Sequence, residues 1–392
     1  MGIAQDHALG RNQRFHVERE STAGTIVQAT GAGAVKVLKS SFASKQERKN
    51  RIDANVSRSR IARITGKRES TWSLECYALP SGTASTAPDI HDLLLNSMGV
   101  ATVGATAVYT LSDSQSTLGT MSLHRNINGV VLQSMLGAST ETMKISASGT
   151  DDPKFSFEGS AFDMLHTGYS TLAAECAASA TVVVADADQF EVGSIIQVGT
   201  STGTGTAATG TGHRVTAKTT VTLTVTPSVT GTQASGLAVV PFSPTETTAG
   251  VPISGNLGSL TANFAGAGAL TLPITQFELT LKNNLKWHDD AAFSAIPVDY
   301  TPGWRDVTGS ISLRARRDQV IALGHYRNSI ASIYDLVVTC GSATGTRFVI
   351  DIDRAEVDGA QMEVPDADEC MIQLPFVAMG SAGADEFTLS FT

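Results

Sequence analysis

Hydrophobic and polar residues alternate along most of this chain, as in strands that cover a core with one face. The pattern is plain in residues 219–226 (TTVTLTVT), 305–316 (RDVTGSISLRAR) and 348–357 (FVIDIDRAEV). A period of two places apolar side chains on one face and polar side chains on the other. We therefore expect a mainly β fold.

One segment has the period of a helix instead. Residues 87–99 (APDIHDLLLNSMG) have Pro88 in the first turn and Gly99 at the stop, as helix ends favour. The apolar residues that should face a sheet are Ile90, Leu93, Leu94 and Met98. A second helix is predicted over 316–330 (RRDQVIALGHYRNSI).

The order strand, long loop, strand, helix and strands occurs twice, and TWSL at 71–74 is matched by SISL at 310–313. Between the two occurrences, 171–250 is rich in Thr, Gly and Ala with short β-branched strands. We predict β-sandwich or barrel domains over 1–170 and 251–392, each with a flanking helix. Residues 171–250 are then a small inserted all-β module that projects outwards.

Charge is unevenly distributed over the 392 residues. The chain has 17% charged residues and a net charge of −9, yet residues 44–68 hold nine Lys or Arg and two acids. Residues 351–386 hold ten acids and one base. Such asymmetry points to partners, and the two regions could bind each other in neighbouring copies.

No segment carries an enzyme or cofactor motif. TGAGAVK lacks the third glycine of a dinucleotide fingerprint, and TGKRES lacks the first glycine and the Ser or Thr of a P-loop. The four cysteines are far apart, which predicts free thiols and no zinc site. WHDD at 287–290 is expected on a solvated loop, and 351–359 is expected to be a strand with an acidic face, not a calcium loop. We expect no catalytic residue, metal or cofactor.

The basic run 44–68 allows three interpretations. It could bind nucleic acid, but it contains no aromatic residue and the remaining charge of the chain opposes such binding. It could be a solvated loop without a partner. We favour a long loop or extended hairpin that docks on an acidic surface of an identical subunit, where mixed charges set the register.

Two parts of the chain resemble siphophage major tail tube proteins. The first comprises 18–60 with 69–82 and the helix 87–99, and the second comprises 303–323, 345–357 and 370–391. The resemblance covers most of the chain outside the Thr-rich insertion.

This resemblance implies a structural virion protein whose sheets continue between neighbours in a ring. Rings stack into a tube through which the genome passes, and a long loop reaches the adjacent ring. A duplicated domain implies a homotrimer, and a single domain implies a homohexamer. Other implied partners are the tail terminator, tape measure and distal tail proteins. Synthesis is expected in the bacterial cytoplasm, and the chain would then reside in the phage tail.

The resemblance also assigns roles to residues. The inter-ring contacts would be Lys45, Arg48, Lys49, Arg51, Arg58, Arg60 and Arg63, and the corresponding loop of the second copy would be 286–304. A bore that repels DNA would let it slide, because neutralised phosphates strengthen binding. The candidate lining acids are Asp289, Asp290, Asp299, Asp351, Asp353, Glu356 and Asp358, with Asp306 beside them.

Two other functions stay open at the level of sequence. A cell-surface β-sandwich adhesin would suit 171–250, although the first 20 residues contain no apolar stretch typical of a secretory signal. A nucleic-acid-binding protein would use 44–68. We expect neither to be the main role.

Overall fold

A computed structural model describes residues 12–50, 63–149, 151–200, 212–247, 250–254, 257–264, 269–272, 274–289, 293–316, 332–364 and 369–392. Within these residues the chain is mainly β, as predicted, with two helices. No helix in the described part is long and apolar enough to cross a membrane.

The first part of the chain forms ten strands and two helices. They are β1 (Gln13–Arg19), β2 (Ala34–Val35), β3 (Lys39–Asn50), β4 (Arg63–Tyr77), α1 (His91–Met98), β5 (Gly99–Val103), β6 (Ala107–Leu111), α2 (Gln115–Leu118), β7 (Met121–Ile127), β8 (Val131–Ser148), β9 (Lys154–Ala161) and β10 (Asp163–Thr167). Helix α1 confirms a helix within 87–99 that ends at Gly99, but it begins at His91, so Pro88 lies before the first turn and not in it. Ile90, Leu93, Leu94 and Met98 are all fully buried, as predicted.

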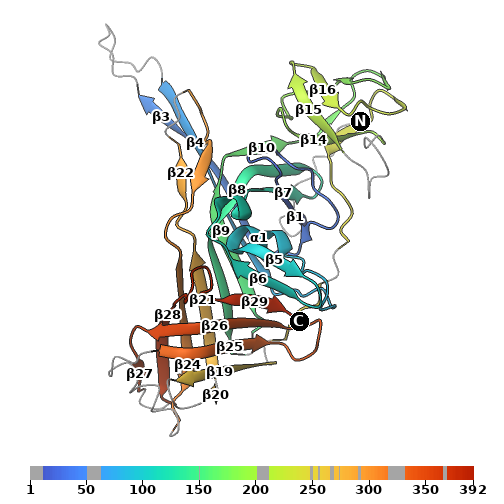
Figure 1. Cartoon of the computed structure of the whole chain (residues 1–392). Helices are drawn as coiled ribbons and strands as arrows, with labels where there is room; N and C mark the ends of the chain where they lie inside the picture. The colour runs from blue at the N-terminus through green and yellow to red at the C-terminus, as the bar shows by residue number, and fades with distance from the viewer. Residues whose placement is uncertain are drawn as a thin grey trace.

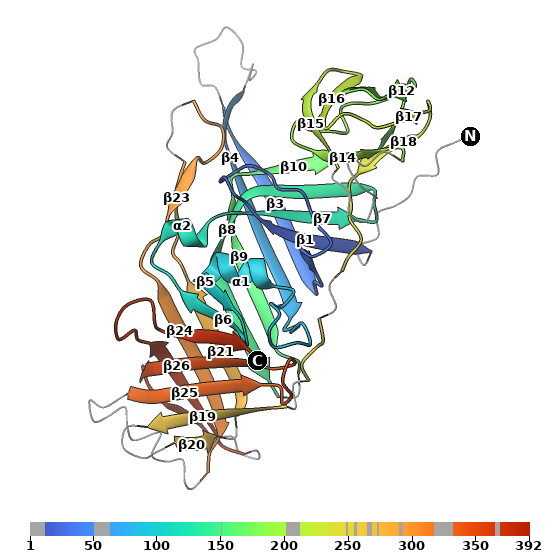
Figure 2. The same ribbon diagram turned by 45° about the vertical axis from the view of Figure 1, so that its right-hand side comes forward.

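The middle of the chain forms short strands only. They are β11 (Ser170–Thr171), β12 (Cys176–Ala177), β13 (Thr181–Val183), β14 (Ile195–Val198), β15 (His213–Lys218), β16 (Thr222–Thr226), β17 (Thr232–Gln233) and β18 (Ala238–Pro241). Six of them form a separate sheet with its own hydrophobic cluster. In β16 Leu223 and Val225 are buried, as the alternation predicted. Figures 1 and 2 show this module standing apart at one end of the molecule.

The last part of the chain returns to long strands. They are β19 (Gly258–Phe264), β20 (Ala269–Leu272), β21 (Ile274–Lys282), β22 (Lys286–His288), β23 (Asp299–Thr301), β24 (Asp306–Arg314), β25 (Ser332–Cys340), β26 (Phe348–Val357), β27 (Gln361–Glu363), β28 (Met371–Ala378) and β29 (Thr388–Phe391). The second predicted helix, 316–330, lies outside the described residues apart from its first position.

One sheet runs through both parts of the chain, and we call it the long sheet. Its eight strands lie in the order β3, β4, β9, β8, β21, β24, β28 and β27, and every adjacent pair is antiparallel. The two parts meet at β8 and β21, where residues 142–148 pair with 276–282. Figure 1 shows these strands running lengthwise through the molecule.

A second layer covers one face of the long sheet. In the first part it contains β1, β2, β7, β10 and the beginning of β8, and in the last part it contains β19, β20, β25, β26 and β29. The core between the layers is one continuous cluster. Phe155 of the first part lies 5.6 Å from Phe348 of the last part, between ring centroids. Burial of apolar side chains from both parts therefore stabilises the sandwich as one body.

Candidate assembly surfaces

Strands β3 and β4 extend beyond the body of the molecule as a two-stranded arm (Figures 1 and 2). Residues 39–46 pair with 68–75, and after a register shift 48–50 pair with 63–65. Lys45, Arg48 and Lys49 are exposed on the arm, and the Lys49 ammonium lies 3.4 Å from the Glu47 carboxylate. The described ends of the basic run, 44–50 and 63–68, thus form an extended hairpin, one of the two forms that the sequence allowed.

The tip of the arm lies outside the described residues, and so do three of its predicted contact residues. These are Arg51, Arg58 and Arg60, whereas Arg63 begins β4. At the base of the arm the Arg68 guanidinium lies 2.9 Å from the Asp163 carboxylate. Burial raises the pKa of Asp163, and the Arg68 charge opposes that rise. The ion pair ties the arm to β10.

The loop predicted as the second copy's counterpart lies beside the arm. The backbone N–H of Arg68 donates to the Ala295 carbonyl at 2.8 Å. Strands β22 and β23 pair within this loop, and Trp287 fixes it because the indole N–H donates to the Glu141 carboxylate at 2.7 Å. The Trp287 ring packs 5.6 Å from that of Phe162, between centroids.

Two predicted lining acids lie on this second loop. Asp289 and Asp299 are both exposed there, and Asp290 lies outside the described residues. The imidazole Nε2 of His288 lies 2.7 Å from the Thr301 hydroxyl. Trp287 and His288 of WHDD therefore lie, partly buried, on the paired strand β22, where the sequence predicted a solvated loop.

The face of the long sheet that points away from the core is rich in Ser and Thr, and we call it the hydroxyl face. Alternation explains its composition, since every second residue of each strand belongs to the core. Its hydroxyl residues are Ser41, Thr71, Ser73, Thr142, Ser146, Ser148, Ser156, Ser160, Thr280, Thr308, Ser310 and Ser312.

Charges of both signs are interspersed on the hydroxyl face. The basic residues there are Lys39, Lys45, Lys144, Lys154, Lys282 and Arg314. The acidic residues are Glu69, Glu75, Glu141, Glu158, Glu278, Asp306, Glu356, Asp358 and Glu363. Acids outnumber bases, so the face is hydroxyl-rich and mildly acidic. Three of the acids, Asp306, Glu356 and Asp358, were candidates from the sequence.

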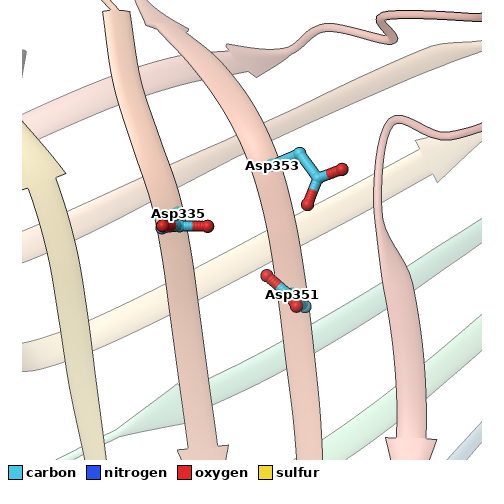
Figure 3. A group of neighbouring side chains, drawn as sticks. All are labelled: Asp335, Asp351 and Asp353. Carbon is cyan, nitrogen blue, oxygen red and sulfur yellow. The ribbon is translucent and has the colours of Figure 1, made fainter.

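Asp351 and Asp353 lie on a different surface. On β26 they alternate with the fully buried Ile350 and Ile352, so they point out of the second layer, on the side of the sandwich opposite the hydroxyl face. Figure 3 shows them beside Asp335 of β25. Asp351 and Asp353 therefore lie on a different surface from Asp306, Glu356 and Asp358.

The sequence did not point to Asp335, because this residue lies on β25 and comes close to Asp351 and Asp353 only through the pairing of β25 with β26. One carboxylate oxygen from each of Asp335, Asp351 and Asp353 lies within 4.8 Å of the other two. Burial first, and then the charges of Asp353 and Asp335, raise the pKa of Asp351. Like charges this close favour the protonated form of one of them.

The two edges of the long sheet are unequal: β3 is an edge strand along its whole length, whereas beside β28 the short strand β27 forms an edge next to residues 371–373 and β26 pairs with residues 376–378. Strand β3 pairs with β4 alone among the described residues, and β27 pairs with β28 alone. All three residues of β27 are exposed. An open edge presents unpaired N–H and C=O groups to another strand.

We compared the chain with curated proteins and with models of protein families. A search of curated proteins found no match. The family model described as phage tail tube protein matches residues 10–378, which span the arm, both parts of the long sheet and the inserted module. The chain therefore belongs to the phage tail tube protein family.

Proposed function

We propose that copies of this chain join edge to edge into rings, and that the rings stack into the tube that delivers a siphophage genome. The observation that carries this proposal is the long sheet with its two open edges. Closing a sheet on itself satisfies the edge groups and removes a site of uncontrolled aggregation. The role is structural, in keeping with the family.

The pairing pattern supports a duplicated tube domain. Strand β1 pairs with β2 and β7, and β19 pairs with β20 and β25. The order β3, β4, β9, β8 within the sheet is repeated as β21, β24, β28, β27. Strands β26 and β27, which both pair with β28, together take the place of the single long strand β8, so β10 returns to β8 as β29 returns to β26. We therefore propose domains over 1–170 and 251–392, with 171–250 inserted between them.

The number of strands favours a ring of three chains. Three copies of the eight-stranded long sheet give 24 strands. Strands about 4.8 Å apart and tilted by about 40° give such a barrel a backbone diameter of roughly 50 Å and a bore of roughly 40 Å. That bore admits one DNA duplex. A ring of six chains would be about twice as wide, which a single duplex does not need.

The hydroxyl face is proposed to line the bore. Acids outnumber bases on this face, so it does not neutralise DNA phosphates as a basic surface would. DNA would therefore pass without specific binding. Under this proposal Asp306, Glu356 and Asp358 face the genome, and Asp351 and Asp353 lie on the outside of the tube. The acidic lining expected from the sequence would then be partly misplaced.

The arm is proposed to connect one ring to the next. It extends beyond the body and exposes Arg48 and Lys49, with Arg51, Arg58 and Arg60 further along the chain. Charged residues of both signs on such a contact set its register more than its strength. A contact that does not close on itself produces a stack of rings.

The inserted module, residues 171–250, and the two ends of the tube are the remaining parts of the proposed assembly. The module has its own core and stands apart from the long sheet, so it would project outwards from the wall. The terminal rings would contact the tail terminator and distal tail proteins, and the tape measure protein would occupy the bore before the genome passes.

Negative-stain electron microscopy of the concentrated protein tests the proposal. We expect hollow striated rods with three-fold symmetry in each striation. A protein that stays a solitary globule at every concentration, and inside its own virion, would contradict it.

The arm is tested separately by Arg48→Glu with Lys49→Glu. We expect rings to form and rods to shorten or disappear, because the reversed charges oppose the next ring. The matched control reverses Lys36 and Lys154, which lie outside the arm. Long rods in the arm variant would contradict the proposed inter-ring contact.

A further inference from the structure

The junction between β8 and β21 supplies a template for the contact between neighbouring chains. Building on the proposed ring, we infer that β27 of one copy pairs antiparallel with β3 of the next, with Lys45 opposite Glu363. Lys45, which the family resemblance placed among the inter-ring contacts, is thereby assigned to the contact within a ring. Within the chain, β8 is the last strand of the first four-strand unit and β21 is the first strand of the second. The open edges, β27 and β3, occupy those same places.

The register follows from matching the two units strand by strand. Phe42 lies opposite Trp72 of TWSL, and Phe277 lies opposite Ile311 of SISL. All four side chains belong to the core. Phe42 therefore corresponds to Phe277, and three residues further along Lys45 corresponds to Thr280.

The other edge is matched in the same way. Phe157, the partner of Leu74 in TWSL, lies opposite Met143. Ile372, the partner of Leu313 in SISL, lies opposite Met362. Met143 therefore corresponds to Met362, and the next residues, Lys144 and Glu363, correspond as well.

The internal pairing then fixes the partner of Lys45. Thr280 lies directly opposite Lys144 across β21 and β8. Replacing each by its counterpart places Lys45 of one copy opposite Glu363 of the next, with Gln46 opposite Met362. Opposite charges facing each other across an antiparallel pair attract at close range.

Two further observations agree with this register. Lys45 pairs with Glu69, and Glu363 pairs with Met371, so both side chains project on the hydroxyl face. A shift by one residue would place them on opposite faces. Both are exposed, and neither has an ion-pair partner among the described residues.

A charge swap tests the inferred contact. Lys45→Glu should lower the fraction of protein in rings at least about tenfold, because the repulsion recurs at every subunit contact. Glu363→Lys should do the same, and the double variant should restore the rings. Lys154→Glu is the matched control, since it reverses a lysine on the same face of β9, which is paired on both sides. Size-exclusion chromatography with microscopy measures the ring fraction.

Cysteine cross-linking tests the register even where a charge variant folds poorly. In a Cys370→Ser background, Lys45→Cys with Glu363→Cys should give a ladder of covalent oligomers on mild oxidation. The shifted pair, Gln46→Cys with Glu363→Cys, should not, since those side chains point to opposite faces.

The outcomes separate the contact from the tube itself. If the wild-type protein forms rings, two results would overturn the register and leave the tube function standing. One is that Lys45→Glu also forms intact rings, and the other is that the shifted cysteine pair gives cross-links. Absence of rings from the wild-type protein and its virion would overturn both.

Discussion

The two parts of the sandwich fill equivalent layers with different chemistry. The first part buries many polar side chains: His16, Glu20, Ser70, Asn96, Ser97, Thr120, Ser122, His124, Asn126, Ser134, Ser139, Thr140, Asp163 and Thr167. Among the described residues after 257, Asn283 is the one buried polar side chain, and it donates to carbonyls of Ser97 and Thr140 in the first part. The last part is otherwise an apolar core of Ile, Leu, Val and Phe.

This difference teaches that one strand order can be stabilised in two ways. In the first part Glu20 holds a long connection in place, because its carboxylate accepts from the Gly24 and Gly137 backbone and from the hydroxyls of Thr120 and Ser122. A buried polar network is stable only when each member is satisfied. The last part relies on packing, which tolerates pH change but not lost volume.

The largest expected effect comes from removing a ring where the two parts meet. Phe348 is fully buried, and its ring centroid lies 5.6 Å from that of Phe155 and 5.9 Å from that of Phe391. Phe348→Ala should lower the free energy of unfolding by about 3–5 kcal/mol through lost burial and a cavity. Urea unfolding of dilute, unassembled protein measures this. Phe293→Ala, at a fully exposed ring, should change little, and equal losses would contradict the shared core.

The next effect tests the polar network of the first part. Glu20→Ala should lower the free energy of unfolding by about 3 kcal/mol, because buried donors lose a charged acceptor. Thermal unfolding followed by circular dichroism measures the loss. Glu158→Ala, at an exposed carboxylate on β9, is the control. A Glu20 variant as stable as that control would show that the network contributes nothing.

A smaller effect depends on pH. His16 and His124 lie opposite each other on β1 and β7, and burial lowers the pKa of each to about 4, against about 6.5 in the unfolded chain. Between these values the unfolded state binds more protons, so stability is complete above about pH 6.5 and falls towards pH 4.

The variant His16→Leu isolates this effect. The buried His16 Nε2 has no hydrogen-bond partner, so stability at neutral pH should change by less than about 1 kcal/mol. The loss of stability on acidification should fall to roughly half, because one of two titrating groups is gone. Urea midpoints at several pH values measure the slope. An unchanged slope would assign the acid sensitivity to other groups.

Local patterns in the sequence predicted the elements that are encoded by residues close together along the chain. The apolar spacing of 87–99 and its stop at Gly99 predicted α1, although not its start at His91, and the alternation around Ile350 predicted β26 with its acidic face. Each of these features is encoded within about 15 residues of chain, where propensity and period carry most of the information.

Other features depend on residues that are distant in the sequence. Strand β8 pairs with β7 and β10 along its beginning and with β9 and β21 along its end, so it belongs to both layers, which a period of two cannot reveal. Glu20 follows the charged stretch Glu18–Arg19, which favours a surface position, and only tertiary contacts bury it. The same holds for Asp335, which the pairing of β25 with β26 brings to Asp351.

The smallest expected effect concerns the junction of the two parts, and it sharpens the comparison with the open edges. Lys144 and Glu278 approach to 3.1 Å there and are partly exposed, so Lys144→Glu should lower the free energy of unfolding by less than about 1 kcal/mol. The covalent chain and the shared core hold β8 against β21 whatever the charge. At the open edges no chain joins the strands, so reversing Lys45 should prevent a ring that reversing Lys144 leaves intact. Unfolding midpoints of Lys144→Glu, and of the double variant Lys144→Glu with Glu278→Lys, measure the effect on stability at the junction. A midpoint shift as large as that of Glu20→Ala would mean that the charge pair, and not the core, holds the two parts together.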